Sequence, residues 1–448
     1  MQNRDIVVIG AGLTGLTTAH HLKKQGRDVL VIEKENRIGG QIRTYNEEGF
    51  VFESGPNTGV VSFPEVRELF DDLDDCQLEI ARESSKRRLI WKGKRFHALP
   101  SGPVEAVTTP LFRLSDKIRI LGEPWRKRGD NPDESVGALA QRRLGKSFYE
   151  YAIDPFISGV YAGDPMRLTT RYAMPKLYNL EANYGSFIRG AIAKAKEPKT
   201  DRDRLVTKKV FSAVGGLSQM VEAMAKGLDI ITSAQDVKIN PSDDGTWSVT
   251  FNGMEEIRCR QVVTTVGAYA LPSLLPFIPE EQMQPISRLY YAPVIQVCVG
   301  IRNTRSHAFP AFGGLVPSKE QKPVLGILFP SECFEGRAPE GGALYSYFIG
   351  GARHADDMQK SDEEIRETVQ NLFHSMLKYP ADMQPDLIRI FRHERAIPQY
   401  WSDSGERFRR IEELQARYPG LILAGNMRDG IGIGNRIHQG AMVAEALR

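Results

Sequence analysis

The chain has 448 residues, too many for one ordinary hydrophobic core, so we expect two or three domains. Hydrophobic residues make up 41% and charged residues 26%, which is typical of a folded globular protein and excludes a disordered one. The 59 basic and 56 acidic residues nearly cancel, and a net charge of +3 gives no reason to expect a nucleic-acid partner.

The four cysteines lie far apart and form no C-x-x-C pair: Cys76, Cys259, Cys298 and Cys333. They indicate reduced thiols in a cytoplasmic protein, not a disulfide framework or a zinc site. The N-terminus runs straight into an apolar strand, so we expect no signal peptide. No apolar run reaches the roughly 18 residues of a membrane-spanning helix. Peripheral membrane contact stays open, because an amphipathic surface leaves little trace in a sequence.

The first elements form a strand–turn–helix–strand unit. Ile6–Ile9 is a β-branched apolar run that predicts a buried parallel strand, and it leads into the glycine turn Gly10–Gly15. An apolar-periodic helix follows and ends near Gly26, and Val29–Ile32 predicts the second strand. This G-x-G-x-x-G turn, in register with both strands, predicts a dinucleotide site.

The residue types of this turn follow from the chemistry of a pyrophosphate. Gly10 permits the tight turn, Gly12 allows close approach of the backbone to the phosphates, and Gly15 allows close helix packing. The N–H groups and dipole of the helix N-terminus attract the anion. Glu33, after the second strand, is placed to accept ribose hydroxyls and disfavours a 2′-phosphate. At this point the cofactor could be NAD or FAD.

The next residues favour FAD. Arg37–Thr44 contains a second glycine pair and then Arg43, and it resembles the R-x-G-G-x-x-x-T extension of the flavin amine oxidase superfamily. The glycines let the chain pass close to the cofactor, and a cation can lie near phosphate or flavin oxygens. Gly55-Pro56-Asn57-Thr58 offers rigid backbone beside the expected flavin ring.

The middle of the chain suggests interleaved domains. Residues 101–204 read as largely helical, and the charged stretch 193–209 as a solvated loop or helix end. Phe211–Leu217 predicts the start of a helix, and Val262–Val266 another buried parallel strand. Weaker strand signals fall at residues 237–239 and 247–251.

The C-terminus repeats the strand–glycine–helix pattern. Leu421–Ala424 predicts a buried strand, Gly430–Gly434 a glycine-rich turn, and the residues up to Ala446 a helix. Such a turn lets backbone lie against a planar ligand. Two units of this kind at opposite ends of one chain favour a single cofactor bound by both.

Further motifs make the likeness more specific. Asp154–Pro165 resembles the signature around the substrate cavity of the protoporphyrinogen/coproporphyrinogen oxidase family, within the flavin amine oxidase superfamily. The segments 312–318, 324–327, 348–353 and 397–400 resemble that family in the same order, so the likeness spans essentially the whole chain.

The resemblance implies an α/β fold: an FAD-binding Rossmann-like (GR2-type) domain, an α+β substrate-binding domain and an inserted helical domain. We expect residues 1–80, 205–275 and 410–448 in the FAD-binding domain, 81–100 and 276–409 in the substrate-binding domain, and 101–204 in the helical domain. The motifs and the resemblance together predict these flavin contacts: Gly10, Ala11, Gly12, Leu13, Thr14, Gly15, Glu33, Lys34, Gly40, Gln41, Arg43, Gly55, Pro56, Asn57, Thr58, Val237, His393, Gly425, Ile431, Gly432 and Ile433.

The resemblance also implies a substrate cavity lined by Leu315, Leu328 and Phe348, with the Gly159 backbone nearby. Apolar walls suit the faces of a flat tetrapyrrole. Arg88 falls where the family places a candidate carboxylate-binding arginine, and a guanidinium matches a propionate geometrically.

The implied reaction is the six-electron oxidation of protoporphyrinogen IX to the porphyrin in haem biosynthesis, with molecular oxygen as acceptor and hydrogen peroxide as product. Each step passes a hydride from a meso carbon to the flavin, so the protein mainly orients the substrate, and we name no catalytic side chain and no metal. Transfer of the product to the next haem-pathway enzyme is a further expectation, and the oligomeric state stays open.

Three alternatives remain at this point. Coproporphyrinogen III carries four propionates, and the cations available for them are Arg87, Arg88, Lys92, Lys94 and Arg95. An amine or carotenoid oxidase of the same superfamily is less favoured, because the motifs at 154–165 and 312–318 point to a porphyrinogen. The third alternative is a flavin- or haem-binding protein without turnover.

Overall fold

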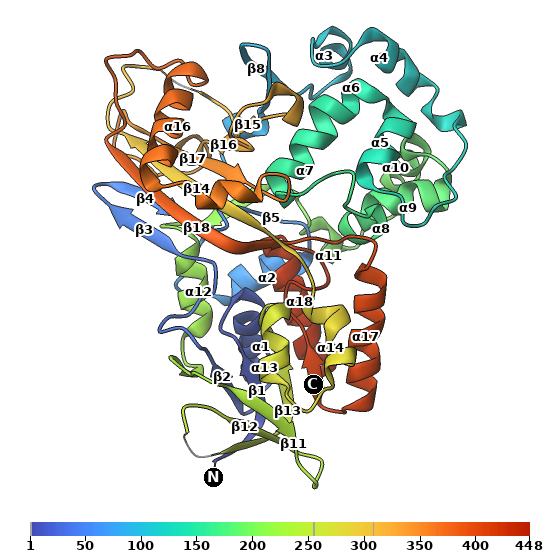
Figure 1. Cartoon of the computed structure of the whole chain (residues 1–448), viewed down its shortest axis with the longest axis vertical. Helices are drawn as coiled ribbons and strands as arrows, with labels where there is room; N and C mark the ends of the chain where they lie inside the picture. The colour runs from blue at the N-terminus through green and yellow to red at the C-terminus, as the bar shows by residue number, and fades with distance from the viewer. Residues whose placement is uncertain (1, 254–255, 308) are drawn as a thin grey trace.

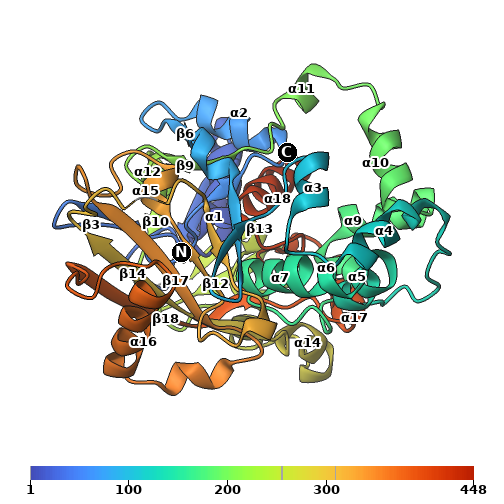
Figure 2. The ribbon, with the colours of Figure 1, turned by 90° about the horizontal axis from the view of Figure 1, so that it is seen from above.

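The computed structural model describes residues 2–253, 256–307 and 309–448, which form two large sheets and a group of helices (Figure 1). The first sheet and its helices lie at the bottom of Figure 1, near both chain ends. The second sheet lies above on the left, and the helices of residues 103–204 lie above on the right. Seen from above in Figure 2, α4 (Leu114–Leu121), α5 (Val136–Leu144) and α10 (Phe187–Ala195) lie on the side away from the second sheet.

The first sheet has the strand order β10-β2-β1-β13-β12-β11, and β19 pairs with the second half of β13. Its parallel strands are β1 (Gln2–Ile9), β2 (Val29–Ile32), β10 (Asp229–Ile231), β13 (Ile257–Thr264) and β19 (Leu421–Leu423), and its antiparallel strands are β11 (Lys238–Pro241) and β12 (Trp247–Thr250). The register places Ile9 opposite both Ile32 and Thr264, and Thr264 opposite Leu423. The turns after β1, β2, β13 and β19 therefore meet at one edge of the sheet.

Both faces of this sheet are covered, which explains the continuous apolar runs in its parallel strands. On one face the core contains side chains of α1 (Leu13–Lys24), α2 (Pro64–Asp72), α12 (Leu217–Ala225) and α18 (Ile433–Ala446). On the other face it contains η4 (Ala268–Ala270), α13 (Leu271–Leu274), α14 (Glu280–Ser287) and α17 (Ser404–Arg417). Helix α18 packs closely on α1, since a Cβ on Gly440 would lie 2.6 Å from Cβ of Thr17.

The second sheet has the order β18-β14-β17-β16-β15-β7-β8. Its strands are β7 (Arg88–Lys92), β8 (Arg95–Ala98), β14 (Tyr291–Ile301), β15 (Gly313–Leu315), β16 (Gly326–Leu328), β17 (Ala343–Gly350) and β18 (Leu387–Pro398). One face packs on α16 (Asp362–Ser375) through a core that includes Val297, Tyr345, Tyr347 and Phe373. The opposite face is turned toward the first sheet and the helical region.

Smaller elements join these parts. A hairpin of β3 (Thr44–Glu47) and β4 (Phe50–Glu53), and a sheet of β5 (Gly59–Val60), β9 (Val210–Ala213) and β6 (Leu78–Ile80), lie between the large sheets. The short helices beside the second sheet are η1 (Glu83–Lys86), η5 (Ser318–Glu320), α15 (Pro330–Cys333) and η6 (Ala355–Gln359). The remaining helices of the helical region are α3 (Pro103–Thr108), η2 (Glu123–Trp125), α6 (Lys146–Phe148), η3 (Tyr149–Ile153), α7 (Asp154–Tyr161), α8 (Thr170–Ala173), α9 (Pro175–Tyr184) and α11 (Asp201–Arg204).

Most predicted elements are confirmed. Val29–Ile32 is β2, residues 262–264 lie in β13, which runs parallel to β1, and residues 101–204 are largely helical. One expectation is wrong in part: Phe211–Ala213 belongs to strand β9, and the helix begins only at Leu217. The strand pairs with β5 and β6, which come from distant sequence, and two glycines with positive φ separate it from the helix. The α/β fold class is confirmed, and the domain limits stay a prediction.

The four cysteines are all buried and free. Within the described residues no helix is long and apolar enough to cross a bilayer. The same residues contain no cluster of His, Cys, Asp or Glu that could hold a metal ion.

Candidate active site

The glycine turn after β1 has the geometry of a phosphate-binding turn. Gly10 has φ +101°, which favours glycine, and a Cβ on Gly15 would lie 2.0 Å from the Gly10 carbonyl oxygen. A Cβ on Gly12 would meet no atom of the described residues within 4 Å. The protein itself therefore requires Gly10 and Gly15, whereas the space at Gly12 is free for a ligand.

Two helix N-termini face this edge with their backbone donors free of side-chain caps. Gly12 is the N-cap of α1 and Gly432 the N-cap of α18, and neither helix has a side-chain cap hydrogen bond. The Thr14 hydroxyl is buried in the first turn of α1 and finds no hydrogen-bond partner in the part of the chain that the structure describes. Free N–H groups, the helix dipole and an unpartnered hydroxyl fit a bound phosphate.

Glu33 lies buried beside the turn, at the end of β2. Its carboxylate accepts hydrogen bonds from the Ala11 N–H at 2.7 Å and from the Glu35 N–H at 2.9 Å. Carboxylate oxygens have lone pairs left over, so ribose hydroxyls can bind there too. The neighbouring Lys34 has an exposed side chain, and its carbonyl accepts from Nε2 of Gln235, which brings the segment of Val237 to the same edge.

The loop after Glu33 folds back over the glycine turn. Arg37 donates hydrogen bonds to the carbonyls of Gly40 at 2.6 Å and Ile42 at 3.2 Å. A Cβ on Gly40 would lie 3.1 Å from Cα of Gly12. Arg37 was not among the predicted contacts. Its position two residues before the glycine pair is the sequence signal that indicates this role in stabilising the loop. Arg43 is exposed, and its guanidinium carbon lies 4.6 Å from the centre of the Tyr45 ring.

The segment Gly55–Thr58 connects this loop to the second sheet. A Cβ on Gly55 would lie 2.2 Å from the Gln41 carbonyl oxygen, so the two segments touch. Asn57 donates to the Gly55 carbonyl at 2.8 Å and accepts a hydrogen bond from the Ser346 hydroxyl at 3.2 Å. Pro56 and Thr58 flank it and are half-buried.

Buried polar residues of the second sheet support the same segment. Nε2 of Gln296 donates to the Glu53 carbonyl at 2.7 Å, and the Glu53 carboxylate accepts from the Leu217 N–H at 2.8 Å. Burial raises the pKa of Glu53. Gln296 and Ser346 were missed because a polar residue in an apolar strand does not show which loop it will meet.

His393 on β18 points at this segment. Its Nε2–H donates to the Ser54 carbonyl at 2.5 Å. Burial lowers the pKa of His393, so the ring is neutral at pH 7. The predicted residue therefore connects the second sheet to the segment that leads into Gly55–Thr58.

The C-terminal turn joins the same edge. Gly425 has φ +104°, and its N–H donates to Oε1 of Gln439 at 2.9 Å. The Tyr400 hydroxyl donates to the Asn426 carbonyl at 2.8 Å, which anchors the following residues. Ile431 packs against a cluster that includes Tyr400, and Gly432 and Ile433 begin α18.

The predicted substrate residues share one face of the second sheet. One row of paired residues runs Arg88–Gly313–Leu328–Ser346 across four strands. Two residues before Leu328 in β16, Gly326 pairs with Leu315 on one side and with Phe348 on the other. Alternation along a strand places all of them on the side opposite the α16 core. Helix α7 covers part of this face, because a Cβ on Gly159 would lie 2.3 Å from Cδ2 of Leu315.

Arg88 lies three strand spacings from Phe348, about 14 Å across the sheet. Its guanidinium carbon stands 4.7 Å from the centre of the Phe312 ring, and no acidic partner occurs among the described residues. Three of the other candidate cations do not face the predicted substrate cavity as free side chains. Lys92 donates to the carbonyls of Pro110 and Leu111, and Arg87 and Arg95 line a separate cavity of about 250 Å³.

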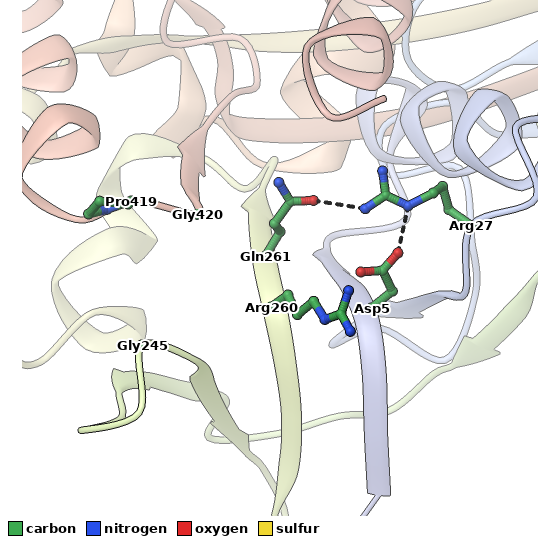
Figure 3. Close-up of a pocket in the computed structure, with 7 residues that line it drawn as sticks. All are labelled: Asp5, Arg27, Gly245, Arg260, Gln261, Pro419 and Gly420. Atoms are coloured by element: carbon green, nitrogen blue, oxygen red, sulfur yellow. Dashed lines mark hydrogen bonds and ion pairs between the residues drawn. The ribbon is translucent and has the colours of Figure 1, made fainter.

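A hollow of about 340 Å³ lies at the opposite edge of the first sheet (Figure 3). There Arg27 donates to Asp5 and Gln261, and Pro419 and Gly420 form the rim. Arg27 precedes β2, and Pro419 and Gly420 precede β19, whereas ligands of open α/β sheets bind at the carboxyl ends of the strands. The hollow is therefore separate from the glycine turns.

Comparison with known proteins agrees with this geometry. The model of the flavin containing amine oxidoreductase family matches residues 13–447. Protoporphyrinogen oxidase 2 of Arabidopsis thaliana is 30% identical over 99% of this chain and 94% of its own length. The chain belongs to this flavoprotein family, in its protoporphyrinogen/coproporphyrinogen oxidase branch.

Other members of the family are also similar along their whole length. Coproporphyrinogen III oxidase of Bacillus subtilis (strain 168) is 26% identical over 99% of this chain and 98% of its own. A crystal structure of a candidate protoporphyrinogen oxidase from Exiguobacterium sp. 255-15 has a TM-score of 0.82 at 21% identity, covering 99% and 98% of the two chains, and supports the fold. The chain is an FAD-dependent oxidoreductase, and the glycine turn with Glu33 fits the dinucleotide form of the flavin.

Proposed function

We propose that this protein oxidises protoporphyrinogen IX to protoporphyrin IX in haem biosynthesis, in three two-electron steps with O2 as acceptor. The observation that carries the proposal is the apolar face formed by Leu315, Leu328 and Phe348, which lies on the same side of the sheet as Ser346, the residue that bonds Asn57 of the Gly55–Thr58 segment. The name of the Arabidopsis relative supports the same substrate.

The cofactor contacts that we propose are the predicted ones. Gly12, Thr14 and the N-termini of α1 and α18 bind the pyrophosphate, and Glu33 binds the ribose. The Gly55–Thr58 segment and His393 support the ring system, since hydrogen bonds from Ser346 and His393 join the second sheet to residues 54–57. FAD, once bound, accepts two electrons from each substrate oxidation and passes them to O2.

The protein's own contribution is orientation. Apolar side chains clamp the faces of the macrocycle and exclude water, and the neutral His393 adds no charge beside the segment that leads into Gly55–Thr58. Arg88 is available for one propionate, because its guanidinium has no acidic partner in the described chain.

Coproporphyrinogen III is the second candidate substrate, supported by the Bacillus relative. Its four propionates need more cations than the face offers. Lys92 is bonded to backbone carbonyls, and Arg87 and Arg95 line another cavity, so the arrangement favours the substrate with two propionates.

Oxygen uptake and porphyrin fluorescence, measured side by side with both porphyrinogens, test the proposal. We expect faster turnover of protoporphyrinogen IX and bleaching of the flavin on anaerobic mixing. A preference for coproporphyrinogen III would support the second candidate. Bound FAD that stays oxidised with both substrates would reject a porphyrinogen oxidase in favour of a carrier or an amine oxidase.

We further propose peripheral membrane contact through the helical region. Six apolar side chains of α3, α4 and η2 are between 59% and 78% exposed: Val104, Val107, Leu114, Ile118, Leu121 and Trp125. The same segments contain the exposed basic residues Arg113, Lys127 and Arg128, whereas Lys117, Arg119 and Arg126 donate to backbone carbonyls. Exposed apolar side chains with exposed cations nearby in the sequence fit an anionic lipid surface, where the porphyrin could pass to the next haem-pathway enzyme.

Co-sedimentation with phosphatidylglycerol and phosphatidylcholine vesicles tests this contact. We expect binding to the anionic vesicles and its loss in the double variant L114E/L121E. The control V214E changes an apolar side chain that is 53% exposed, outside the patch, and should bind like the unaltered protein. Equal sedimentation of both variants would contradict the proposal.

A further inference from the structure

Strand β18 has an irregularity close to the expected flavin. His393 pairs with Val294 and Ile397 with Ala292, so three residues of β18 stand opposite the single residue Pro293 of β14. Proline has no N–H to donate, which explains why the ladder is interrupted there. Bulges of this kind re-aim side chains, and the middle residue of the three is Arg395.

Arg395 touches the first sheet at two places. Its carbonyl accepts a hydrogen bond from Nε2 of Gln41 at 3.2 Å, in the loop after β2. Its guanidinium carbon lies 4.0 Å from the centre of the Tyr269 ring, in the segment after β13. Tyr269 in turn packs edge-on against Tyr291, whose hydroxyl bonds the Ala268 N–H and Asn426.

The strand order of the first sheet shows which turn lies between the two contacts of Arg395. The sheet runs β2-β1-β13, so the loops after β2 and β13 flank the turn after β1. An arginine that contacts both flanking loops spans the turn between them, which contains Gly10 and the open space at Gly12. Its guanidinium is exposed and has no acceptor or acidic partner in the described part of the protein.

The other arginines near the Gly10–Gly15 turn already have partners, so the pyrophosphate can still bind a further cation. Arg37 is committed to backbone carbonyls, Arg43 lies over Tyr45, and Gln41 is uncharged. A pyrophosphate carries two negative charges, and a guanidinium fork matches phosphate oxygens. We propose that Arg395 binds the pyrophosphate of FAD from the side of the second sheet and closes the cofactor site over the glycine turn. This inference concerns the flavin alone and is independent of which porphyrinogen is oxidised.

The test is the retention of FAD by the full-length holoprotein. Fluorescence of FAD released on dilution gives the Kd at roughly 50 mM and 500 mM NaCl, because an ionic contact weakens as salt screens it. We expect R395Q to raise the Kd about ten-fold at low salt and much less at high salt, and R395K to stay within about three-fold. The control R392Q alters an arginine of the same strand that pairs with Asp362, and should leave the Kd unchanged.

Three further readouts separate this role from others. The absorbance spectrum and midpoint potential of the bound flavin should be unchanged in R395Q, because the proposed contact is with the pyrophosphate and not with the ring. Y269L should raise the Kd and Y269F should not, since only the leucine removes the ring beneath the guanidinium. Three results would each overturn the proposal: an unchanged Kd for FAD in R395Q, a Kd that rises equally at both salt concentrations, or a raised KM for the porphyrinogen with normal FAD binding.

Discussion

Within one turn, glycine serves different physical purposes at different positions. Gly10 needs a positive φ and Gly15 needs space against the Gly10 carbonyl, and both needs exist without any ligand. Gly12 has an ordinary extended backbone and empty surroundings. Only a bound phosphate explains why that position stays free of a side chain.

This difference predicts opposite behaviour for two valine substitutions. Gly12→Val should fold and yet fail to bind FAD, because its side chain occupies the place of the pyrophosphate. Gly15→Val should lose at least about 3 kcal/mol of unfolding free energy, since a Cβ 2.0 Å from a backbone oxygen forces the turn apart. Circular dichroism with urea unfolding, and flavin absorbance after purification, check both. A yellow Gly12→Val protein would contradict the assignment.

Arg88 permits a second prediction for a single residue. Arg88→Ala should raise KM for the porphyrinogen about ten-fold and lower kcat less, because one charge-assisted contact to a propionate is lost. Steady-state kinetics with Arg95→Ala as the control would check it, since Arg95 lines the other cavity. An unchanged KM would remove Arg88 from the substrate site.

At the scale of elements, the decisive contact holds α7 on the second sheet. Asp154, buried at the start of α7, accepts hydrogen bonds from the Ser318 N–H at 2.7 Å and from Arg353 at 2.8 Å. These partners follow β15 and β17, so one carboxylate joins three segments. The contact sets where Gly159 meets Leu315, and thus the shape of the substrate face.

We therefore expect Asp154→Asn to cost about 2 to 4 kcal/mol of unfolding free energy, because it leaves a half-buried Arg353 without its carboxylate. KM for the porphyrinogen should rise as α7 loosens. Urea unfolding and kinetics measure both effects. Asp133→Asn, in a more exposed pair with Arg171, is the control and should change stability by less than about 1 kcal/mol. An equal loss of unfolding free energy in the two variants would argue against a special role for Asp154.

At the scale of the whole molecule, a charge cluster ties the helical region to the first sheet. Glu65 of α2 is buried and pairs with Arg202 of α11 at 2.6 Å and with His438 of α18 at 3.0 Å. Burial would raise the pKa of Glu65, yet the hydrogen bond from His438 and the charge of Arg202 outweigh it and lower the pKa to about 2. The ionised carboxylate therefore stabilises the folded protein.

The sign of the pH dependence follows from that lowered pKa. The stabilisation is fully present above the ordinary value of 4.5 and is lost as the pH falls toward 2. Glu65→Gln should cost about 2 kcal/mol at pH 7, and its difference from the unaltered protein should shrink between pH 4.5 and 3. Urea midpoints at pH 7, 4.5 and 3 check this, with the more exposed Glu68→Gln as control. A difference independent of pH would contradict it.

The sequence by itself determined the local units. The runs Ile6–Ile9 and Val29–Ile32, the glycine turn between them and the strand–glycine–helix pattern at the C-terminus were readable, because strand burial, glycine φ and helix periodicity act over a few residues. The same local patterns, with the likeness to known motifs, were enough to predict FAD as the cofactor.

Only the tertiary structure decided which distant residues share a surface. Nothing local in Val210–Ala213 selects a strand over a helix, because its partners β5 and β6 are far away in sequence. Likewise Gln296, Ser346 and Arg395 acquire their contacts through strand register and through a bulge opposite Pro293. Register and packing bring side chains that are hundreds of residues apart in sequence into contact. Local periodicity contains no information about these long-range contacts.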